Sequence, residues 1–389
     1  MGNFKLKITS RVPVLLVLLV LLLFVPASLS MSAAAAAAAR AMLPRTMRAV
    51  VRVAESAESA GSAGAIEVVT REVPTPKATE VLVKVHATAL NRMDLLQAAG
   101  RYPVPAGVTD VLGVELAGEI VGGDVDGYRV GDRVMALTSG GSYAEYCTVE
   151  ASQLMPIPEG LSMAQAAAIP ETWLTAYQLL HLVGGPLEAG ETVVVHAAGS
   201  GVGCAATQLA TTGAGARVFA TAGSQSKLDH AISLGASAGF NYKEGDWAPA
   251  LAAAAGEHGV QLVLDCIGGS YVEQNLAVMS MDARWVLYGL MGGAGVGDGN
   301  PFLVKLLRKR IQLRSTTLRA RSKAYKADLV ARFAAHALPK FADKSYRPIL
   351  DEKSFALDDA MAAHAYMASN ANMGKIVLTV AEAEAKADL

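Results

Sequence analysis

The chain has 389 residues, 34 of them basic and 35 acidic, and a formal net charge of -1. This length exceeds what one ordinary hydrophobic core accommodates and predicts two domains. The composition, 52% hydrophobic and 18% charged, is typical of a globular chain. A nearly neutral chain offers no electrostatic surface for nucleic acid, so no nucleic-acid partner is expected. Its three dispersed cysteines form no CxxC pair, which excludes a disulfide framework or zinc knuckle and fits a reducing compartment.

Residues 1–46 have the features of a targeting extension. Three basic residues precede an apolar run, Val14–Val25, and small residues and an alanine-rich linker follow. This order is typical of a signal peptide, although a membrane span usually needs about 20 residues. Alternatively, translation starts at Met31 or Met47 and the protein is cytoplasmic. The lack of glycosylation acceptors and of a disulfide pattern favours this second interpretation. In the first case the secretory pathway or the ER membrane is expected, and a membrane contact requires that the segment is retained.

Short strand-like runs separated by turn residues follow the extension. They are Val81–His86, Glu119–Val121, Arg133–Leu137 and Tyr143–Val149. Their length and alternation predict a mostly antiparallel β domain over residues 47–170.

Strands and helices alternate from about Ala164 onward. The expected strands are Thr192–His196, Arg217–Thr221, Gly239–Tyr242, Val260–Asp265 and Trp285–Tyr288. This rhythm predicts a doubly wound parallel (Rossmann) sheet over residues 171–325. A helix over 361–370 and a strand over 375–380 leave no room for another βα unit. Residues 326–380 are therefore expected to return to the first domain, and 381–389 form a tail.

A glycine-rich loop follows the first strand of the parallel sheet. It comprises Gly199, Ser200, Gly201, Val202 and Gly203. Such a loop lets the backbone approach a pyrophosphate, whose charge then faces the N-terminus of the next helix. A strict GxGxxG motif would need glycine at 204, where this chain has cysteine, so the loop is persuasive only in its strand–helix context.

The end of the next strand predicts which dinucleotide binds. An NAD enzyme usually has an acidic residue about 20 residues past the loop, and here the first acid is Asp229. Ser224 and Lys227 suit a 2′-phosphate, which favours NADPH. The alternative for Lys227 is an ordinary solvated lysine at a helix start.

Two motifs resemble those of the medium-chain dehydrogenase/reductases, Gly113–Gly118 and Ala89–Asp94. Zinc alcohol dehydrogenases of this superfamily carry GHExxG and GxCxxD at these places. Val114 stands at the histidine position and Asn91 at the cysteine position. Since zinc needs thiolate and imidazole ligands, no metal site is expected.

Longer strings resemble the zinc-free, zeta-crystallin-like quinone oxidoreductases, and in particular the tumour-suppressor-inducible quinone oxidoreductase subgroup. They are Leu154–Leu161, Ala166–Ala176, Gln178–Gly184, Thr221–Gln225, Ala238–Lys243, Leu264–Tyr271 and Arg284–Gly293. The resemblance covers about residues 47–380. It implies a GroES-like β domain into which the Rossmann domain is inserted.

The resemblance also implies roles for individual residues. The quinone and nicotinamide pocket corresponds to Asn91, Asp94, Tyr102 and Thr175. The adenosine 2′-phosphate site corresponds to Lys227 and Tyr242. Later strand ends, which bind ribose and nicotinamide in open sheets, carry Cys266, Ile267, Gly268, Tyr288, Gly289, Leu290 and Met291. Asn372 and Lys375 near the last strand are expected to complete the site.

Structural alternatives stay open for several of these residues. Asn91 and Asp94 could form a self-capped turn, and Tyr102 could be a core residue. Cys266 is of a kind more often buried as a small apolar side chain than used in redox chemistry. His86, His181 and His196 have no ligand or triad partner in the sequence and are expected to be structural.

The expected function is NADPH-dependent reduction of a small-molecule quinone. A quinone needs little acid–base help, because its reduction creates a delocalised oxyanion that a hydrogen bond from Tyr102, Asn91 or water could stabilise. One alternative is reduction of the C=C bond of a 2-alkenal or an enoyl thioester. Another is a non-catalytic, crystallin-like NADPH-binding protein. The family resemblance further implies a homodimer.

Overall fold

The structure, a computed structural model, describes residues 43–53 and 65–380. The apolar run Val14–Val25, its alanine-rich linker and the tail 381–389 lie outside these residues. Within the described ranges, no helix is both long and apolar enough to cross a membrane.

A seven-stranded, mostly antiparallel sheet contains both early and late parts of the chain. Its path runs β14-β15-β3-β4-β5-β7, and β6 also pairs with β3. The strands are β3 (Glu80–Ala89), β4 (Glu115–Gly122), β5 (Arg133–Leu137), β6 (Tyr146–Glu150), β7 (Leu154–Pro156), β14 (Phe355–Ala356) and β15 (Val377–Thr379). β15 pairs antiparallel with β3, so the chain returns to its first sheet. A separate antiparallel pair is formed by β1 (Thr46–Arg52) and β2 (Ile66–Glu72).

A six-stranded parallel sheet lies between these segments in sequence. Its order is β10-β9-β8-β11-β12-β13. The strands are β8 (Thr192–Val195), β9 (Arg217–Ala222), β10 (Ala238–Asn241), β11 (Val260–Asp265), β12 (Met279–Leu287) and β13 (Gln312–Ser315). Numbered along the chain, this is the 3-2-1-4-5-6 order of dinucleotide-binding folds. The order reverses between β8 and β11, where such sheets bind ligands beyond the carboxyl ends of their strands.

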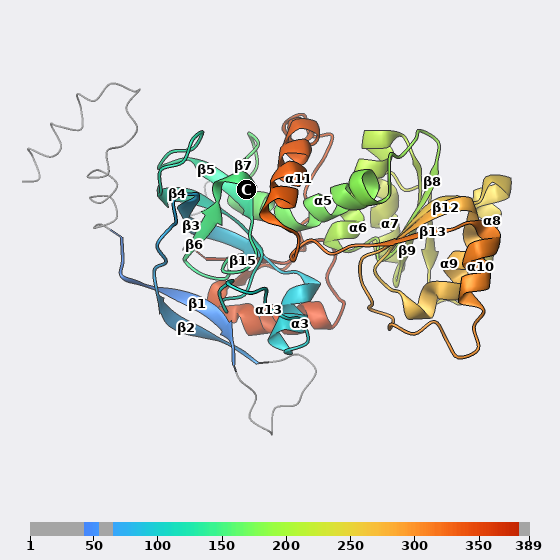
Figure 1. Cartoon of the computed structure of the whole chain (residues 1–389), viewed down its shortest axis with the longest axis horizontal. Coiled ribbons are helices and arrows are strands. Elements are labelled where there is room, and N and C mark those ends of the chain that lie inside the picture. Colours follow the sequence, from blue (N-terminus) through green and yellow to red (C-terminus); the bar gives the residue numbers. More distant parts are fainter. Residues whose placement is uncertain (1–42, 54–64, 381–389) are drawn as a thin grey trace, which may run out of the picture. The chain divides into compact units, whose positions relative to one another are not determined.

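Helices cover both faces of the parallel sheet (Figure 1). On one side lie α6 (Gly201–Gln208) and α7 (Gln225–Ser233), and on the other α8 (Ala248–Ala255), α9 (Val272–Val278) and α10 (Phe302–Lys309). All four residues of β8 are buried. Val193 and Val195 pack with α6 and α7, whereas Val194 packs with α8 and α9. The apolar, β-branched run Val193–Val195 is therefore required here, because neither face meets water.

The remaining helices flank the mostly antiparallel sheet or connect it to the parallel one. They are α3 (Arg92–Ala98), α4 (Met163–Ala167), α5 (Pro170–Tyr177), α11 (Lys323–His336), α12 (Leu338–Ala342) and α13 (Ala360–Ala368). The predicted fold class, a Rossmann sheet inserted in a GroES-like β domain, is confirmed by these two sheets. The boundaries at 170/171 and 325/326 stay a prediction.

A buried polar network fixes the carboxyl end of β11. Asp265, fully buried, accepts hydrogen bonds from the N–H groups of Ile267 and Gly268 at 2.7 and 3.0 Å. Its second oxygen accepts from Asn275 Nδ2 and Trp285 Nε1, each at 3.0 Å. One carboxylate thereby satisfies four donors and shapes the turn after the strand.

His196 extends this network and is structural, as expected. Its Nε2 lies 2.8 Å from Asn275 Oδ1, and its Nδ1 lies 2.8 Å from Thr221 Oγ1. Because Asn275 directs its amide N–H group toward Asp265, its oxygen must accept a hydrogen bond from the Nε2–H group of His196. Burial lowers the pKa of His196, which keeps the ring neutral in this tautomer.

We expect Asp265→Ala to destabilise the fold strongly. The substitution leaves up to four buried donors without an acceptor, and each such donor costs about 1–3 kcal/mol. The free energy of unfolding should therefore fall by at least about 3 kcal/mol. The free energy of unfolding in urea measures this loss. Asp328→Ala is the control, because Asp328 forms an exposed ion pair with Arg332 within α11, and it should leave the urea midpoint almost unchanged. A loss under about 1 kcal/mol in Asp265→Ala would contradict this role.

Candidate functional site

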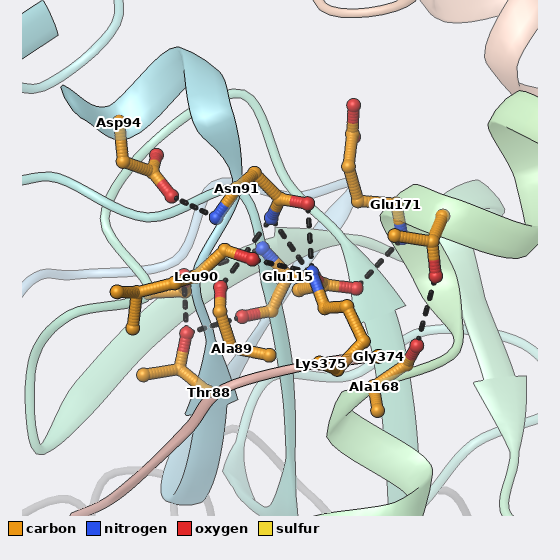
Figure 2. A network of polar contacts seen from close by, with 12 residues as sticks. Thr88, Ala89, Leu90, Asn91, Asp94, Glu115, Ala168, Glu171, Gly374 and Lys375 are labelled. Atoms are coloured by element: carbon orange, nitrogen blue, oxygen red, sulfur yellow. Dashed lines mark hydrogen bonds and ion pairs between the residues drawn. The ribbon is translucent and has the colours of Figure 1, made fainter. Parts of the chain in front are cut away.

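A buried ion pair occupies the centre of the candidate site (Figure 2). Lys375 Nζ lies 2.6 Å from Glu115 Oε1, and the two side chains are 4% and 0% exposed. The ammonium also donates to the carbonyl oxygen of Leu90 at 2.6 Å and to Asn91 Oδ1 at 2.7 Å. With these three acceptors, every N–H bond of the ammonium is used.

Asn91 and Asp94 have different tasks in the observed arrangement. The amide of Asn91 bridges the ion pair, since its Nδ2 donates to Glu115 Oε1 at 2.8 Å while its oxygen accepts from Lys375. Asp94 Oδ2 accepts from the backbone N–H of Asn91 at 2.8 Å and from the Tyr143 hydroxyl at 3.2 Å. Asp94 thus caps the start of α3, as the turn alternative anticipated. Burial raises its pKa to about 6.

Helix α5 brings a second carboxyl group to the site. The N–H of Glu171 donates to Glu115 Oε2 at 2.8 Å, and the Glu171 side chain extends away from that contact (Figure 2). Thr175 lies four residues further along α5, so the two side chains share a helix face. Both residues are 8% exposed. Burial, reinforced by the neighbouring charge of Glu115, raises the pKa of Glu171 to about 8.

Cations from the segment after β13 lie beside Tyr102. The guanidinium carbon of Arg319 lies 5.6 Å from the Tyr102 ring centre. Arg319 donates to Ser139 O and Gln97 Oε1, each at 2.7 Å, and Lys326 donates to Ser139 Oγ at 2.7 Å. Both cations are at least 97% buried. Tyr102 itself is half-buried at this position.

The glycine loop lies where a dinucleotide would be held. Ser200 caps α6 by accepting from the Gly203 N–H at 3.0 Å. A Cβ atom at Gly203 would lie 2.5 Å from the carbonyl oxygen of Ala197, and one at Gly201 2.6 Å from Cδ of Lys375. Side chains therefore do not fit at these two positions. The loop, with Val202 in the first turn of α6, has the bare backbone and helix N-terminus that suit a pyrophosphate.

The predicted 2′-phosphate residues lie on one side of this loop. Ser224 caps α7, accepting from the Lys227 N–H at 3.4 Å. The Lys227 stem covers Gly199, where a Cβ atom would meet Cγ at 2.9 Å, and its Nζ donates to Asn370 O at 2.7 Å. Tyr242 is 42% exposed, and its hydroxyl lies against Gly223.

The ends of β11 and β12 bring together the residues expected at the nicotinamide side. A Cβ atom at Gly289 would lie 2.9 Å from Cys266 O, and the N–H of Met291 donates to that oxygen at 3.0 Å. Gly268 has φ 74°, which favours glycine in this turn. The set also includes Ile267, Tyr288 and Leu290. The N–H of Ile267 donates to Asp265, and Leu290 is 53% exposed. Burial raises the pKa of Cys266 to about 12, so its sulfur stays a thiol and behaves as a small buried side chain.

Asn372 lies in the turn before Lys375 and donates to Gly374 O at 3.2 Å. The N–H of Gly374 donates to Gly199 O at 2.8 Å, so this turn contacts the glycine loop. Within residues 43–53 and 65–380, no three His, Cys, Asp or Glu side chains gather as a candidate metal site. The zinc-ligand positions of the resemblance hold Val114, fully buried among apolar residues, and Asn91.

The sequence prediction missed residues that the structure puts at the centre of the site. Glu115 lies inside the motif Gly113–Gly118, from which only the absence of a zinc-ligand histidine was inferred. Glu171 lies inside the string Ala166–Ala176, where only Thr175 was assigned a role. Arg319 and Lys326 belong to no motif, so no sequence signal distinguished them from solvated cations.

Comparisons with known proteins agree with this arrangement. The family model described as "Alcohol dehydrogenase GroES-like domain" matches residues 77–159, and "Zinc-binding dehydrogenase" matches residues 201–335. The Quinone oxidoreductase of Rattus norvegicus is 32% identical over 223 residues, covering 57% of this chain and 67% of that protein.

Multidomain synthases are also similar. Highly-reducing polyketide synthase 1 of Aureobasidium melanogenum is 31% identical over 304 residues, or 77% of this chain. The chain spans only 13% of the length of that synthase.

Two solved structures give the same picture. The Escherichia coli quinone oxidoreductase complexed with NADPH matches with a TM-score of 0.75 and 26% identity, over 86% of this chain and 100% of that one. The CurK enoyl reductase matches with a TM-score of 0.73 and 27% identity, over 86% and 99%. With its two sheets, its glycine loop and its non-ligating residues at the zinc positions, the chain belongs to the quinone oxidoreductase family, a zinc-free branch of the medium-chain dehydrogenase/reductases.

Proposed function

We propose that this protein reduces quinones with NADPH. The observation that carries the proposal is the Lys375 ammonium, bonded to Asn91 Oδ1 and Glu115 Oε1 beside the glycine loop. In the zinc-dependent relatives this neighbourhood supplies a Lewis acid that activates an alcohol. An ammonium whose N–H bonds are all used cannot act as a Lewis acid on the substrate. The acceptor must therefore accept electrons readily by itself, as a quinone does.

The dinucleotide would supply a hydride from its nicotinamide ring. The chain's own residues position the reactants, since little else is required for a reactive acceptor. The backbone of Gly199–Gly203 would hold the pyrophosphate, and the turn after β11 would lie at the nicotinamide. Tyr102 and Thr175 would line the acceptor side.

NADPH rather than NADH is supported by the charges around Ser224. Lys227 lies within electrostatic range of Arg92 and Lys243, and both lower its pKa, although burial is the larger cause. Three neighbouring cations, with Asp351 as the one acidic group that acts on Lys227, leave a net positive charge that suits a 2′-phosphate better than a bare ribose diol. The neighbours complexed with NADPH support the same choice.

Reduction of a conjugated C=C bond is the second candidate. It is favoured by the similarity to a polyketide synthase and to an enoyl reductase. The same fold and cofactor would serve it, and the acceptor pocket would decide between the two reactions. A non-catalytic NADPH-binding protein is the third possibility. Such a protein would have no use for two ionisable side chains, Glu171 and Arg319, buried beside the site.

A second copy of this chain is the partner we propose. Among the described strands, β13 is the edge of the parallel sheet, and its Leu313 is 41% exposed. An open edge with an apolar side chain favours pairing with another strand. We expect light scattering after size-exclusion chromatography to give twice the mass of one chain. A monomer at micromolar concentration would contradict this partner.

We expect the full chain to oxidise NADPH when 1,2-naphthoquinone is present. The value of kcat/KM should exceed about 10⁴ M⁻¹s⁻¹, the lower range for enzymes acting on their own substrate class. Absorbance at 340 nm measures the reaction, with a 2-alkenal and a 2-enoyl thioester as competing acceptors. Turnover of those acceptors without the quinone would contradict the proposal. Tight NADPH binding without any turnover would favour the binding protein.

We expect Lys227→Ala to weaken NADPH binding about tenfold or more, because a hydrogen bond to a charged group contributes about 1.5–3 kcal/mol. NADH binding should stay unchanged, since it lacks the 2′-phosphate. Nicotinamide fluorescence titration measures both dissociation constants. The control is Lys353→Ala, an exposed lysine that lies over Tyr366. If Lys227→Ala still binds NADPH more tightly than NADH to the same degree, Lys227 is an ordinary solvated lysine and does not bind the 2′-phosphate.

A further inference from the structure

Three buried polar side chains around the site each retain an atom without a hydrogen-bond partner among the described residues. The atoms are Asp94 Oδ1, Glu171 Oε2 and Arg319 Nη2. The side chains belong to residues that are 0%, 8% and 3% exposed. Buried polar groups are normally paired, so such a group calls for a specific explanation. Three of them in one neighbourhood, of both charge signs, point to a polar ligand.

The surroundings of Glu171 raise its pKa, so that its carboxyl group stays protonated at neutral pH. Its carboxyl group is influenced by two negative neighbours, Glu115 and Asp94, and by two cations, Lys375 and Lys326. Lys375 is already bonded to Glu115, and Lys326 to Ser139. Burial dominates and raises the pKa of Glu171 to about 8, so at pH 7 the group is a neutral acid that can donate its proton.

Arg319 supplies the complementary group. Two of its nitrogens are fixed by Ser139 O and Gln97 Oε1, each at 2.7 Å, which holds the guanidinium plane over Tyr102. Its Nη2 is the remaining donor. Arg319 interacts electrostatically with both Asp94 and Glu171, so its charge reaches the same space. A fixed, buried cation can stabilise an oxygen on which negative charge develops.

We propose that Arg319 binds the carbonyl oxygen of the acceptor and that Glu171 donates the proton that completes its reduction. The acceptor is then a conjugated carbonyl compound, and a quinone is the preferred member of that class. This inference rests on the proposed reductase function.

The step balances in atoms and electrons. The acceptor gains a hydride, with its electron pair, from the reduced nicotinamide, which is thereby oxidised. Negative charge moves to the carbonyl oxygen beside Arg319. The O–H bond of Glu171 breaks, its proton bonds to that oxygen, and the carboxylate later takes a proton from solvent.

The proposal predicts how the rate depends on pH. Below about pH 8, Glu171 carries its proton and donates it. As the pH rises through about 8, the group becomes a carboxylate that faces Glu115 and Asp94 and has no proton to give. We therefore expect kcat to fall above pH 8.

The test compares the full chain with Glu171→Gln, which retains the shape of the side chain and the backbone bond to Glu115. With NADPH and 1,2-naphthoquinone at pH 7, we expect kcat to fall about 10²-fold, the lower range for general-acid catalysis. The residual rate should no longer decline between pH 7 and pH 9. The dissociation constant of NADPH should stay within about twofold, because Glu171 does not hold the dinucleotide.

Arg319→Gln tests the second half of the proposal. We expect KM for the quinone to rise about tenfold or more, since a hydrogen bond to a charged group is lost. Arg321→Gln is the matched control, as its half-buried guanidinium lies over Tyr325 and not over Tyr102. Glu119→Gln on β4 is the control for the carboxyl substitution. Both controls should retain wild-type kcat, KM and pH profile.

The outcomes are distinguishable. A wild-type kcat and pH profile in Glu171→Gln would overturn the proton donor, while an active wild-type protein would leave the reductase function standing. An inactive wild-type protein would overturn the proposed function itself. If Glu171→Gln does not fold, Glu171→Asp decides. A shifted midpoint of its pH profile supports the proposal, and an unchanged midpoint overturns it.

Discussion

The buried ion pair between Lys375 and Glu115 is the constraint on which the site depends. Removing two charges from water costs several kcal/mol for each ion, and attraction compensates only when every remaining donor and acceptor is satisfied. Here the ammonium has three acceptors, and both carboxylate oxygens accept hydrogen bonds, from Asn91 and from the N–H of Glu171. Four segments distant in sequence must therefore meet at one point. The final segment before β15 is as necessary to the site as the motif at Gly113–Gly118.

The same lysine also connects the ion pair to the dinucleotide loop. Its stem lies so close to Gly201 that a Cβ atom there would be 2.6 Å from Cδ, and the preceding residue donates its N–H to Gly199 O. Gly201 is thus required for the passage of Lys375, and the proposed approach of a pyrophosphate would need the same bare backbone. In the family's zinc-dependent relatives a metal lies in this region, whereas in this chain an ammonium fixes the geometry without adding a Lewis acid.

Much of the fold could be predicted from local patterns, and much of the site could not. The run Val193–Val195 is apolar because both faces of the parallel sheet are covered, and that signal is local. The partnership of Glu115 with Lys375 spans 260 residues and leaves no local pattern. Asp94 was predicted to line the pocket, and its hydrogen bonds show that it caps α3. The pocket role of Asp94 stays a prediction. Arg319 resembles any surface arginine in sequence, because only burial distinguishes it.

The ion pair also explains why the two neighbouring carboxyl groups differ. Glu115 is held by an ammonium and two N–H donors, which together use both of its oxygens. Glu171 is buried next to Glu115, and the nearby cations Lys375 and Lys326 only partly offset this burial, so its pKa is raised to about 8. Two neighbouring carboxyl groups in different surroundings can therefore take different tasks, one of them structural and the other that of an acid. Because Lys375 and Asn91 already engage Glu115, Glu171 is the carboxyl group that remains available for the proton donation proposed above.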